Sequence, residues 1–257
     1  MLKEKDIHEF LQNAGIKPTD TVLIHLSMKA IGEVENGCDG LIDGFKSYLT
    51  DGLFVVPTHT WDSVKAENPF YDVNVTPPCV GALPTVASKR KDGIRSLHPS
   101  HSVWATGKRA KEFVLGEEKS ETPCPVGGVW SRLYDENAKI LLIGVGLNRN
   151  TYIHAIDERM GKDERLGKTP FIVTITDYDG NKIQHAFRGH GYAYSSNYEV
   201  YRKPLEHAGA LVTARLGNAD VGIFDAQKGT HVIENLWKKA EYDLVKEFKE
   251  IPEEYYL

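Results

Sequence analysis

KILLIGVGLNRNTYIHAIDERMG (residues 139–161) places an apolar run directly before a helical pattern. The first part, KILLIGVGL (139–147), predicts a buried strand, because short continuous apolar runs are typical of strands covered on both faces. In the second part, Ile153, Ile156 and Met160 fall on one side of a helix. A buried strand followed at once by a helix is the repeating unit of α/β proteins.

The same alternation of strand and helix occurs upstream. TVLIHLSM (21–28) and GLFVVPTHTW (52–61) predict buried strands, and CDGLIDGFKSYLT (38–50) between them predicts a helix, which together form a parallel unit. Downstream, FIVTITDYDGNKIQHAF (171–187) carries β-branched residues on both sides of Asp179-Gly180, which predicts an antiparallel hairpin. Further expected elements are helices near residues 6–15, 80–91, 108–115 and 127–136, short strands in 101–107 and 210–217, and two helices that flank the last strand.

These elements predict one α/β domain over residues 1–257, with a mixed sheet that has a parallel core, antiparallel C-terminal additions and flanking helices. The chain is long enough to bury a sizeable core, and its sequence contains no repeat or linker that marks a domain boundary. The polar, proline-marked stretch 62–79 is expected to form a loop over the surface. Loops of this length are often functional.

Composition and charge are those of an ordinary globular protein. Hydrophobic residues make up 41% and charged residues 26% of the chain. The net charge of -5 argues against a nucleic-acid or anionic-membrane partner and favours a cationic or neutral small substrate. Three widely spaced cysteines without a CxxC pair predict free thiols in a reducing compartment. The charged N-terminus and the lack of an apolar run near the ~20 residues of a membrane span predict a cytoplasmic protein.

The predicted helix after residue 147 contains one histidine and two carboxylates. His154 lies away from the expected buried stripe, Asp157 flanks that stripe at i+3 from the histidine, and Glu158 points nearly opposite the core. Asn150 or Thr151 is expected to cap the helix at the carboxyl end of a strand, where α/β sheets bind ligands. These residues leave two readings of His154 open, a catalytic base or a polar residue on an ordinary helix.

Other motifs exclude several classes of protein. His98-Pro-Ser-His101 has a spacing that suggests metal ligands, but Pro99 interrupts the helix that such a pair needs and neither His185 nor His190 lies at a recognisable offset, so no metal site is expected. The sequence GVG (144–146) lacks the GxGxxG of dehydrogenases, no GxxxxGK[ST] of P-loop enzymes occurs, and no serine lies in the GxSxG of α/β-hydrolases.

Four stretches together resemble one family, the aminoglycoside 3-N-acetyltransferases that use acetyl-coenzyme A. They are HLSMKAIG (25–32), RSLHPSHSVWATG (95–107), KILLIGVGLNRNTYIHAIDE (139–158) and GIFDAQ (222–227), and their order and spacing match over nearly the whole chain. The resemblance implies a fold distinct from the common GNAT acetyltransferases, a bacterial source, and acetyl transfer from acetyl-coenzyme A to an amine, the 3-amino group of an aminoglycoside. It implies no partner other than these two small molecules, and the oligomeric state is not indicated.

The resemblance also implies roles for single residues. It makes His154 the general base and Asp157 the carboxylate that orients it, although the family usually has Glu there and Glu158 is the alternative in this chain. It places the cofactor along residues 27–32 and the 95–103 loop, where Lys29 and Arg95 are expected to meet phosphates. The implied cofactor-binding set is Ser27, Met28, Lys29, Gly32, Arg95, His98, Ser102 and Val103.

Two departures from the family concern the acceptor. The loop 62–79 is shorter than in the resistance enzymes, and Arg-Gly-His-Gly-Tyr (188–192) replaces an acidic segment that helps to receive polycationic drugs. Glu67, Asp72 and His190 are therefore the expected acceptor-binding residues. Three classes of function follow: an aminoglycoside acetyltransferase, an acetyltransferase for another amine, and a non-catalytic coenzyme A binding protein. The presence of both His154 and Asp157 argues against the third class.

Overall fold

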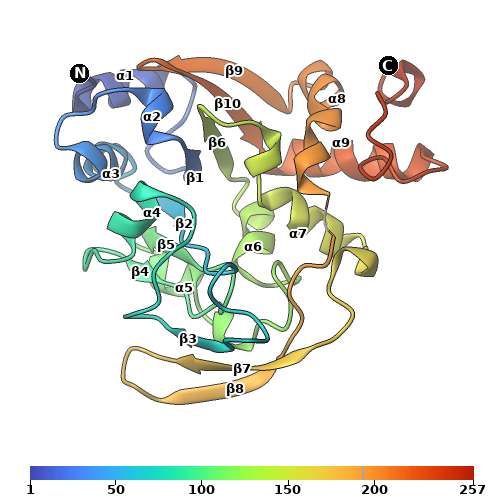
Figure 1. Cartoon of the computed structure of the whole chain (residues 1–257). Coiled ribbons are helices and arrows are strands. Elements are labelled where there is room, and N and C mark those ends of the chain that lie inside the picture. The colour runs from blue at the N-terminus through green and yellow to red at the C-terminus, as the bar shows by residue number, and fades with distance from the viewer. Residues whose placement is uncertain (193) are drawn as a thin grey trace.

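A computed structural model describes residues 1–192 and 194–257 (Figure 1). The described strands form a seven-stranded sheet in the order β4-β5-β2-β1-β6-β10-β9 and a three-stranded sheet in the order β3-β7-β8. The strands are β1 (Thr21–Leu26), β2 (Leu53–Pro57), β3 (Phe70–Asp72), β4 (Ile94–Arg95), β5 (Val103–Thr106), β6 (Lys139–Ile143), β7 (Phe171–Thr176), β8 (Lys182–Phe187), β9 (Leu211–Leu216) and β10 (Ala219–Asp225).

Helices cover both faces of the larger sheet, as the continuous apolar strands predict. The α-helices are α1 (Glu4–Asn13), α2 (Met28–Ile31), α3 (Gly37–Tyr48), α4 (Ala82–Ala87), α5 (Ala110–Phe113), α6 (Val129–Asp135), α7 (Tyr152–Arg159), α8 (Arg202–His207) and α9 (Ala226–Lys239). Short 3-10 helices span Glu117–Lys119, Leu147–Arg149, Asp163–Arg165, Ser195–Tyr201 and Glu253–Tyr255. No helix in the described ranges is long and apolar enough to cross a membrane.

The centre of the larger sheet is parallel, which confirms the predicted fold class. Strand β1 pairs in parallel with β2 and with β6, so that Leu23 lies opposite Val55 on one side and Ile140 on the other. Strands β5 and β10 extend this core in the antiparallel direction, and β9 forms a hairpin with β10. The carboxyl ends of β1, β2 and β6 therefore meet at one edge, where the amino end of β5 also lies.

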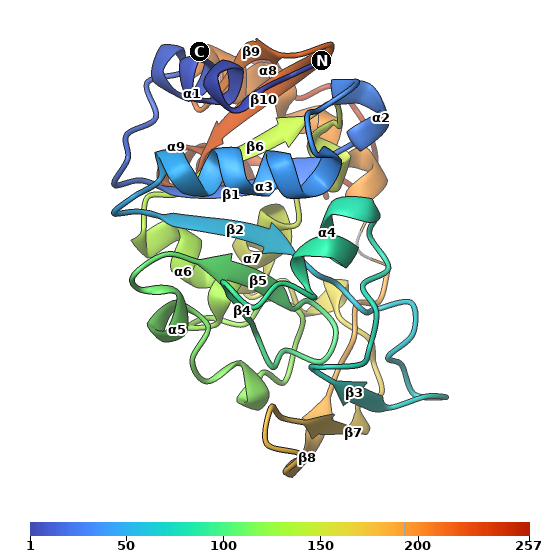
Figure 2. The ribbon, with the colours of Figure 1, turned by 90° about the vertical axis from the view of Figure 1, so that its left-hand side faces the viewer.

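Side chains of β1 alternate between two apolar clusters. Val22 and Ile24 pack with residues of α1 and α3, whereas Leu23 packs on the opposite face with residues of α6, α7 and α9. Full burial of each such side chain contributes ~1.5–3 kcal/mol. Because both faces are covered, the sheet edge is the surface left for a ligand, and in Figure 2 β2 points toward the side of the molecule where α2 and α4 lie.

The stretch 62–79 departs from the expected surface loop. It contains β3, which pairs in parallel with β7 of the predicted hairpin, and its Tyr71 and Val73 are buried against β7 and β8. The expectation was wrong because this strand is short and lies among polar and proline residues. The two alternating apolar positions of the stretch, Tyr71 and Val73, are too few to give a recognisable strand pattern in the sequence. Two smaller differences concern element bounds. The helix expected over 80–91 covers only residues 82–87, and residues 219–225, where no strand was expected, form β10.

Candidate functional site

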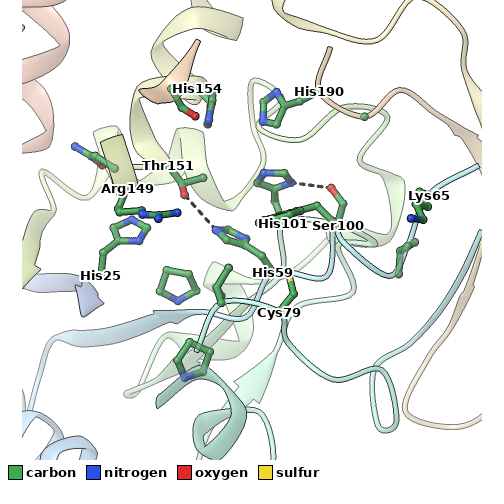
Figure 3. Close-up of a pocket in the computed structure, with 18 of the residues that line it drawn as sticks. His25, His59, Lys65, Cys79, Ser100, His101, Arg149, Thr151, His154 and His190 are labelled. Atoms are coloured by element: carbon green, nitrogen blue, oxygen red, sulfur yellow. Dashed lines mark hydrogen bonds between the residues drawn. The ribbon is translucent and has the colours of Figure 1, made fainter. Parts of the chain in front are cut away.

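A cavity of about 1070 Å³ lies at the sheet edge where the parallel strands end (Figure 3). His25 and Leu26 reach it from the end of β1, and Pro57 and His59 from the end of β2. Other segments of the wall are the turn before β5, the turn after β6, the start of α7 and the chain after β8, together with residues within 61–67, 79–84 and 167–171. Residues far apart in sequence therefore meet here because of the parallel topology.

His154 lies in the wall of this cavity, on the first turns of α7. Its Nδ1 is 2.8 Å from the hydroxyl of Tyr198, and that hydroxyl donates to Oδ2 of Asp157 at 3.0 Å. No hydrogen bond or ion pair between described atoms joins His154 and Asp157 directly, so the expected direct pair is replaced by a bridge through Tyr198. Tyr198 comes from the 3-10 helix Ser195–Tyr201, 44 residues further along the chain, and no local sequence pattern connects it with α7.

Helix α7 is more buried than its amphipathic pattern predicts. Residues 152–157 are all buried, because α6 and α9 pack on one side and the chain around Tyr198 covers the other. Glu158 was expected to point away from the core, but Oε2 accepts from Thr122 Oγ1 at 2.5 Å and Oε1 from Cys124 N at 2.8 Å. Glu158 therefore fixes the neighbouring segment and is turned away from His154.

Of the two residues predicted to cap α7, only Asn150 accepts a backbone N–H of the first turn. Asn150 Oδ1 accepts from the Tyr152 N–H at 3.3 Å. Thr151 makes no cap of its own, and its hydroxyl instead lies 3.1 Å from Nε2 of His59. This contact joins the start of α7 to the segment that follows β2, and both residues line the cavity.

A row of imidazole rings runs along the cavity wall. Ring centroids are 4.7 Å apart between His59 and His101, 4.9 Å between His101 and His190, and 4.1 Å between His190 and His154. His25 stacks on Trp130 at 6.2 Å beside this row. Among the residues that the structure describes, no group of three or more His, Cys, Asp or Glu side chains is arranged to hold a metal ion.

Burial controls the charge of these groups. Desolvation lowers the pKa of His154 well below its ordinary value, and the neighbouring His190 and His59 lower it further. Desolvation raises the pKa of Asp157 to about 7, although the positive charge of Arg165 opposes this shift. His154 is therefore a neutral imidazole at neutral pH, which is the form that can accept a proton.

The 95–103 loop lies beneath the cavity, and most of its predicted cofactor residues are buried structural groups. Arg95 is 3% exposed, and its guanidinium donates to the carbonyls of Thr58, Val73 and Thr76. It is thus unavailable to a phosphate, contrary to expectation. His98 accepts backbone N–H groups of its own loop, and Ser102 and Val103 are completely buried where β5 begins.

The other predicted cofactor residues lie at the rim. Leu26 lines the cavity, and Ser27 to Gly32 follow it through α2 at the same edge. Ser27 Oγ caps α2 by accepting from Ala30 N at 3.2 Å. Lys29 is exposed and makes no ion pair with a described residue, so it remains a candidate contact for phosphate. Gly32 has a positive φ of 89°, which suits glycine at this turn.

The predicted acceptor residues divide in the same way. Glu67 and His190 line the cavity. Asp72 does not, because its Oδ1 accepts from Asn74 N at 2.8 Å within the turn after β3. Glu67 is the one carboxylate among the described lining residues, which also include the cations Lys65 and Arg149.

Sequence reasoning missed several residues of the cavity. His25 and His59 each lie at or just beyond the end of a parallel strand, a position that could have identified them. Arg149 lies in the short segment between β6 and α7, and it too follows a strand end. Arg188, which was expected near the acceptor, lies outside the lining and is 3.4 Å from Asp163.

Related proteins share the fold of this chain. The chain is 26% identical over 248 residues to aminoglycoside N(3)-acetyltransferase IX of Micromonospora chalcea, which covers 84% of this chain and 86% of the relative. The solved apoenzyme of aminoglycoside acetyltransferase AAC(3)-IVa has the same fold, with a TM-score of 0.76 at 21% identity over 93% of this chain and 89% of that one.

A further solved structure, AAC-IIIb in a binary complex with CoASH, matches with a TM-score of 0.73 at 16% identity, covering 90% of this chain and 94% of that one. The family model described as aminoglycoside 3-N-acetyltransferase matches residues 23–238. That match covers most of the chain and nearly every element around the cavity. The protein therefore belongs to the aminoglycoside 3-N-acetyltransferase family, whose members are acyltransferases.

Proposed function

We propose that this protein transfers the acetyl group of acetyl-coenzyme A to an amine and that His154 is the general base. The observation that carries the proposal is the state of His154 in the cavity wall. Its Nδ1 is engaged by Tyr198, whereas no described residue hydrogen-bonds its Nε2. Burial keeps the ring neutral at neutral pH. An imidazole in this state can accept a proton from a substrate in the cavity.

The chemistry needs only a base and two substrates held together. An ammonium with a pKa near ~10 cannot attack a thioester until it loses a proton. As the free amine nitrogen bonds to the acetyl carbon, it loses a proton to Nε2 of His154. The carbon–sulfur bond then breaks, and His154 returns the proton to the sulfur, so that coenzyme A leaves as the thiol. Holding both substrates in one cavity contributes several kcal/mol of the rate enhancement, up to ~7–11 kcal/mol in the best-oriented cases.

The cavity is suited to acetyl-coenzyme A and a second substrate together. Its volume of about 1070 Å³ exceeds the ~300–1,000 Å³ typical of pockets for one small molecule. Lys29 on α2 is an exposed cation without an ion-pair partner among the described residues, and it would meet the phosphates. Ser27 and its neighbours would hold the pantetheine arm. The related AAC-IIIb was solved with CoASH, which supports this assignment.

A second candidate, acetylation of an amine other than an aminoglycoside, is favoured by the charge of the lining. Drugs with several ammonium groups need several carboxylates, because each exposed ion pair contributes only ~0–1 kcal/mol. Among the described lining residues this cavity offers one carboxylate, Glu67, and Lys65 and Arg149 would repel such a drug. A smaller or less charged amine is therefore proposed as the better acceptor, and classical aminoglycosides as weak ones.

Steady-state thiol release from acetyl-coenzyme A tests both candidates. The acceptors are gentamicin, with several ammonium groups, and glucosamine, with one. If the second candidate is correct, the wild type should have a higher kcat/KM for glucosamine than for gentamicin. The KM for gentamicin should also be lower in Arg149→Gln than in the wild type. A kcat/KM for gentamicin of ~10⁴ M⁻¹s⁻¹ or more would instead establish the aminoglycoside as a true substrate. Binding of acetyl-coenzyme A without turnover of any amine would support a non-catalytic protein.

A further inference from the structure

We propose that Tyr198 is a positioning residue that links Asp157 to His154 and selects the tautomer in which Nε2 of His154 is free to accept a proton. The inference rests on the proposed role of His154 as general base. It adds a residue from outside α7 to the machinery and gives Asp157 an indirect role.

The direction of the hydrogen bonds decides the tautomer. The Tyr198 hydroxyl carries one proton, which it donates to Oδ2 of Asp157 when that carboxyl is ionised. The hydroxyl can then only accept from His154, so Nδ1 bears the imidazole proton and Nε2 presents its lone pair to the cavity. When Asp157 is protonated, its own O–H can donate to Tyr198, the hydroxyl donates to Nδ1, and the proton of the ring moves to Nε2. That tautomer cannot act as a base.

Burial makes the link strong. Tyr198 is 0% exposed and Asp157 is 1% exposed, so water does not compete for these hydrogen bonds. Oδ1 of Asp157 has no partner among the described residues, and the Tyr198 hydroxyl is therefore the main contact through which this carboxyl is held. A buried hydroxyl between a carboxylate and an imidazole is costly to leave unpaired, which fixes the arrangement of all three groups.

Other ionisable groups face this link from several elements. His190, His59 and His101 approach His154 from the cavity side. Arg165 approaches Asp157, but its Nη2 donates to both oxygens of Asp243 and makes no hydrogen bond to Asp157. Further charged or titratable groups near the link in the described part of the chain are Lys162, Tyr201 and the thiol of Cys124.

Tyr198→Phe removes only the hydroxyl, and Tyr201→Phe is the matched control. Tyr201 is equally buried and belongs to the same 3-10 helix, but its hydroxyl accepts from Trp237 Nε1 at 2.9 Å. We expect Tyr198→Phe to lower kcat on the order of 10²-fold with the KM for acetyl-coenzyme A unchanged, whereas Tyr201→Phe keeps the wild-type kcat. The acid limb of the wild-type pH profile follows ionisation of Asp157. In Tyr198→Phe alone the tautomer of His154 no longer depends on Asp157, so the limb should follow protonation of His154, whose pKa burial lowers, and move to lower pH.

Two further measurements separate this inference from the proposed function. Asp157→Asn should also lower kcat, and the double variant with Tyr198→Phe should be no slower than the slower single variant, because both changes break one link. Nitrogen-15 NMR of the His154 ring, which needs no turnover, should show the proton on Nδ1 in the wild type at pH 8 and a mixture of tautomers in Tyr198→Phe. Additive losses, or an unchanged tautomer in Tyr198→Phe, would overturn the inference even if His154 proves to be the base. Absence of turnover in the wild type, with the tautomers as stated, would overturn only the proposed function.

Discussion

Replacing Arg95 by Met distinguishes a structural arginine from a phosphate-binding one. Met keeps most of the apolar stem but removes the guanidinium, which donates to the carbonyls of Thr76 at 2.7 Å, Thr58 at 3.0 Å and Val73 at 3.3 Å. Each buried acceptor left without a partner costs ~1–3 kcal/mol. The Thr58 carbonyl keeps the Ser102 hydroxyl as a donor at 2.7 Å, so the carbonyls of Thr76 and Val73 together predict a loss of roughly 2 kcal/mol or more in the free energy of unfolding.

Thermal unfolding and steady-state kinetics together measure this effect. For a chain of this size, ~1 kcal/mol lowers the Tm by ~2–4 °C, so Arg95→Met should unfold at least ~4 °C below the wild type. Its KM for acetyl-coenzyme A should be unchanged at a temperature where both proteins are folded. Lys29→Ala should show the opposite pattern. Its free energy of unfolding should stay within ~0.5 kcal/mol of the wild type, and its KM for acetyl-coenzyme A should be raised. An unchanged Tm for Arg95→Met with a tenfold higher KM would refute the structural role.

Three further predictions test other parts of the molecule. Acetyl-coenzyme A should raise the Tm, because a ligand at a hundred times its Kd stabilises the folded state by ~2.7 kcal/mol; no shift in differential scanning fluorimetry at millimolar concentration would exclude binding. Glu158→Gln should lower the free energy of unfolding by ~1–2 kcal/mol in urea titrations but change kcat less than Asp157→Asn does, because Glu158 bonds Thr122 and Cys124; the reverse order would make Glu158 the orienting carboxylate. Burial raises the pKa of Glu117 to about 7, so the wild type should lose stability relative to Glu117→Gln as the pH rises from 5 to 8, by a few kcal/mol at most; equal pH dependence of both proteins would contradict this.

The parallel core could be predicted because its strands are apolar on both faces. Leu23 and Ile24 of β1 point to opposite clusters, and a short continuous apolar run of this kind is typical of a strand that is covered on both faces. The hairpin β7–β8 followed equally well from the turn at Asp179-Gly180. Strand β3 was missed because three residues between proline-rich flanks give too short a pattern, and only pairing with β7 makes it a strand.

The site was predictable in part. His154 and Asp157 stand in a local pattern and next to a strand end, whereas Tyr198 is brought to them by packing over a distance of 44 residues in sequence. A helical angle could not show that Glu158 is held by Cys124, because the segment 122–124 covers a side of α7 that the pattern treats as exposed. Arg95 shows the same limit, since a charged residue in a family-like motif gives no indication from sequence that its partners are carbonyls of the protein itself.

The rate of thiol release from acetyl-coenzyme A in the presence of an amine, compared between the wild type and His154→Ala, tests the central claim most directly. We expect turnover by the wild type and a loss of roughly 10²- to 10⁴-fold in kcat for the variant, with acetyl-coenzyme A still bound and the fold retained by circular dichroism. Wild-type kcat in His154→Ala would contradict the claim and move the base to another residue of the cavity, with His190 the next to test.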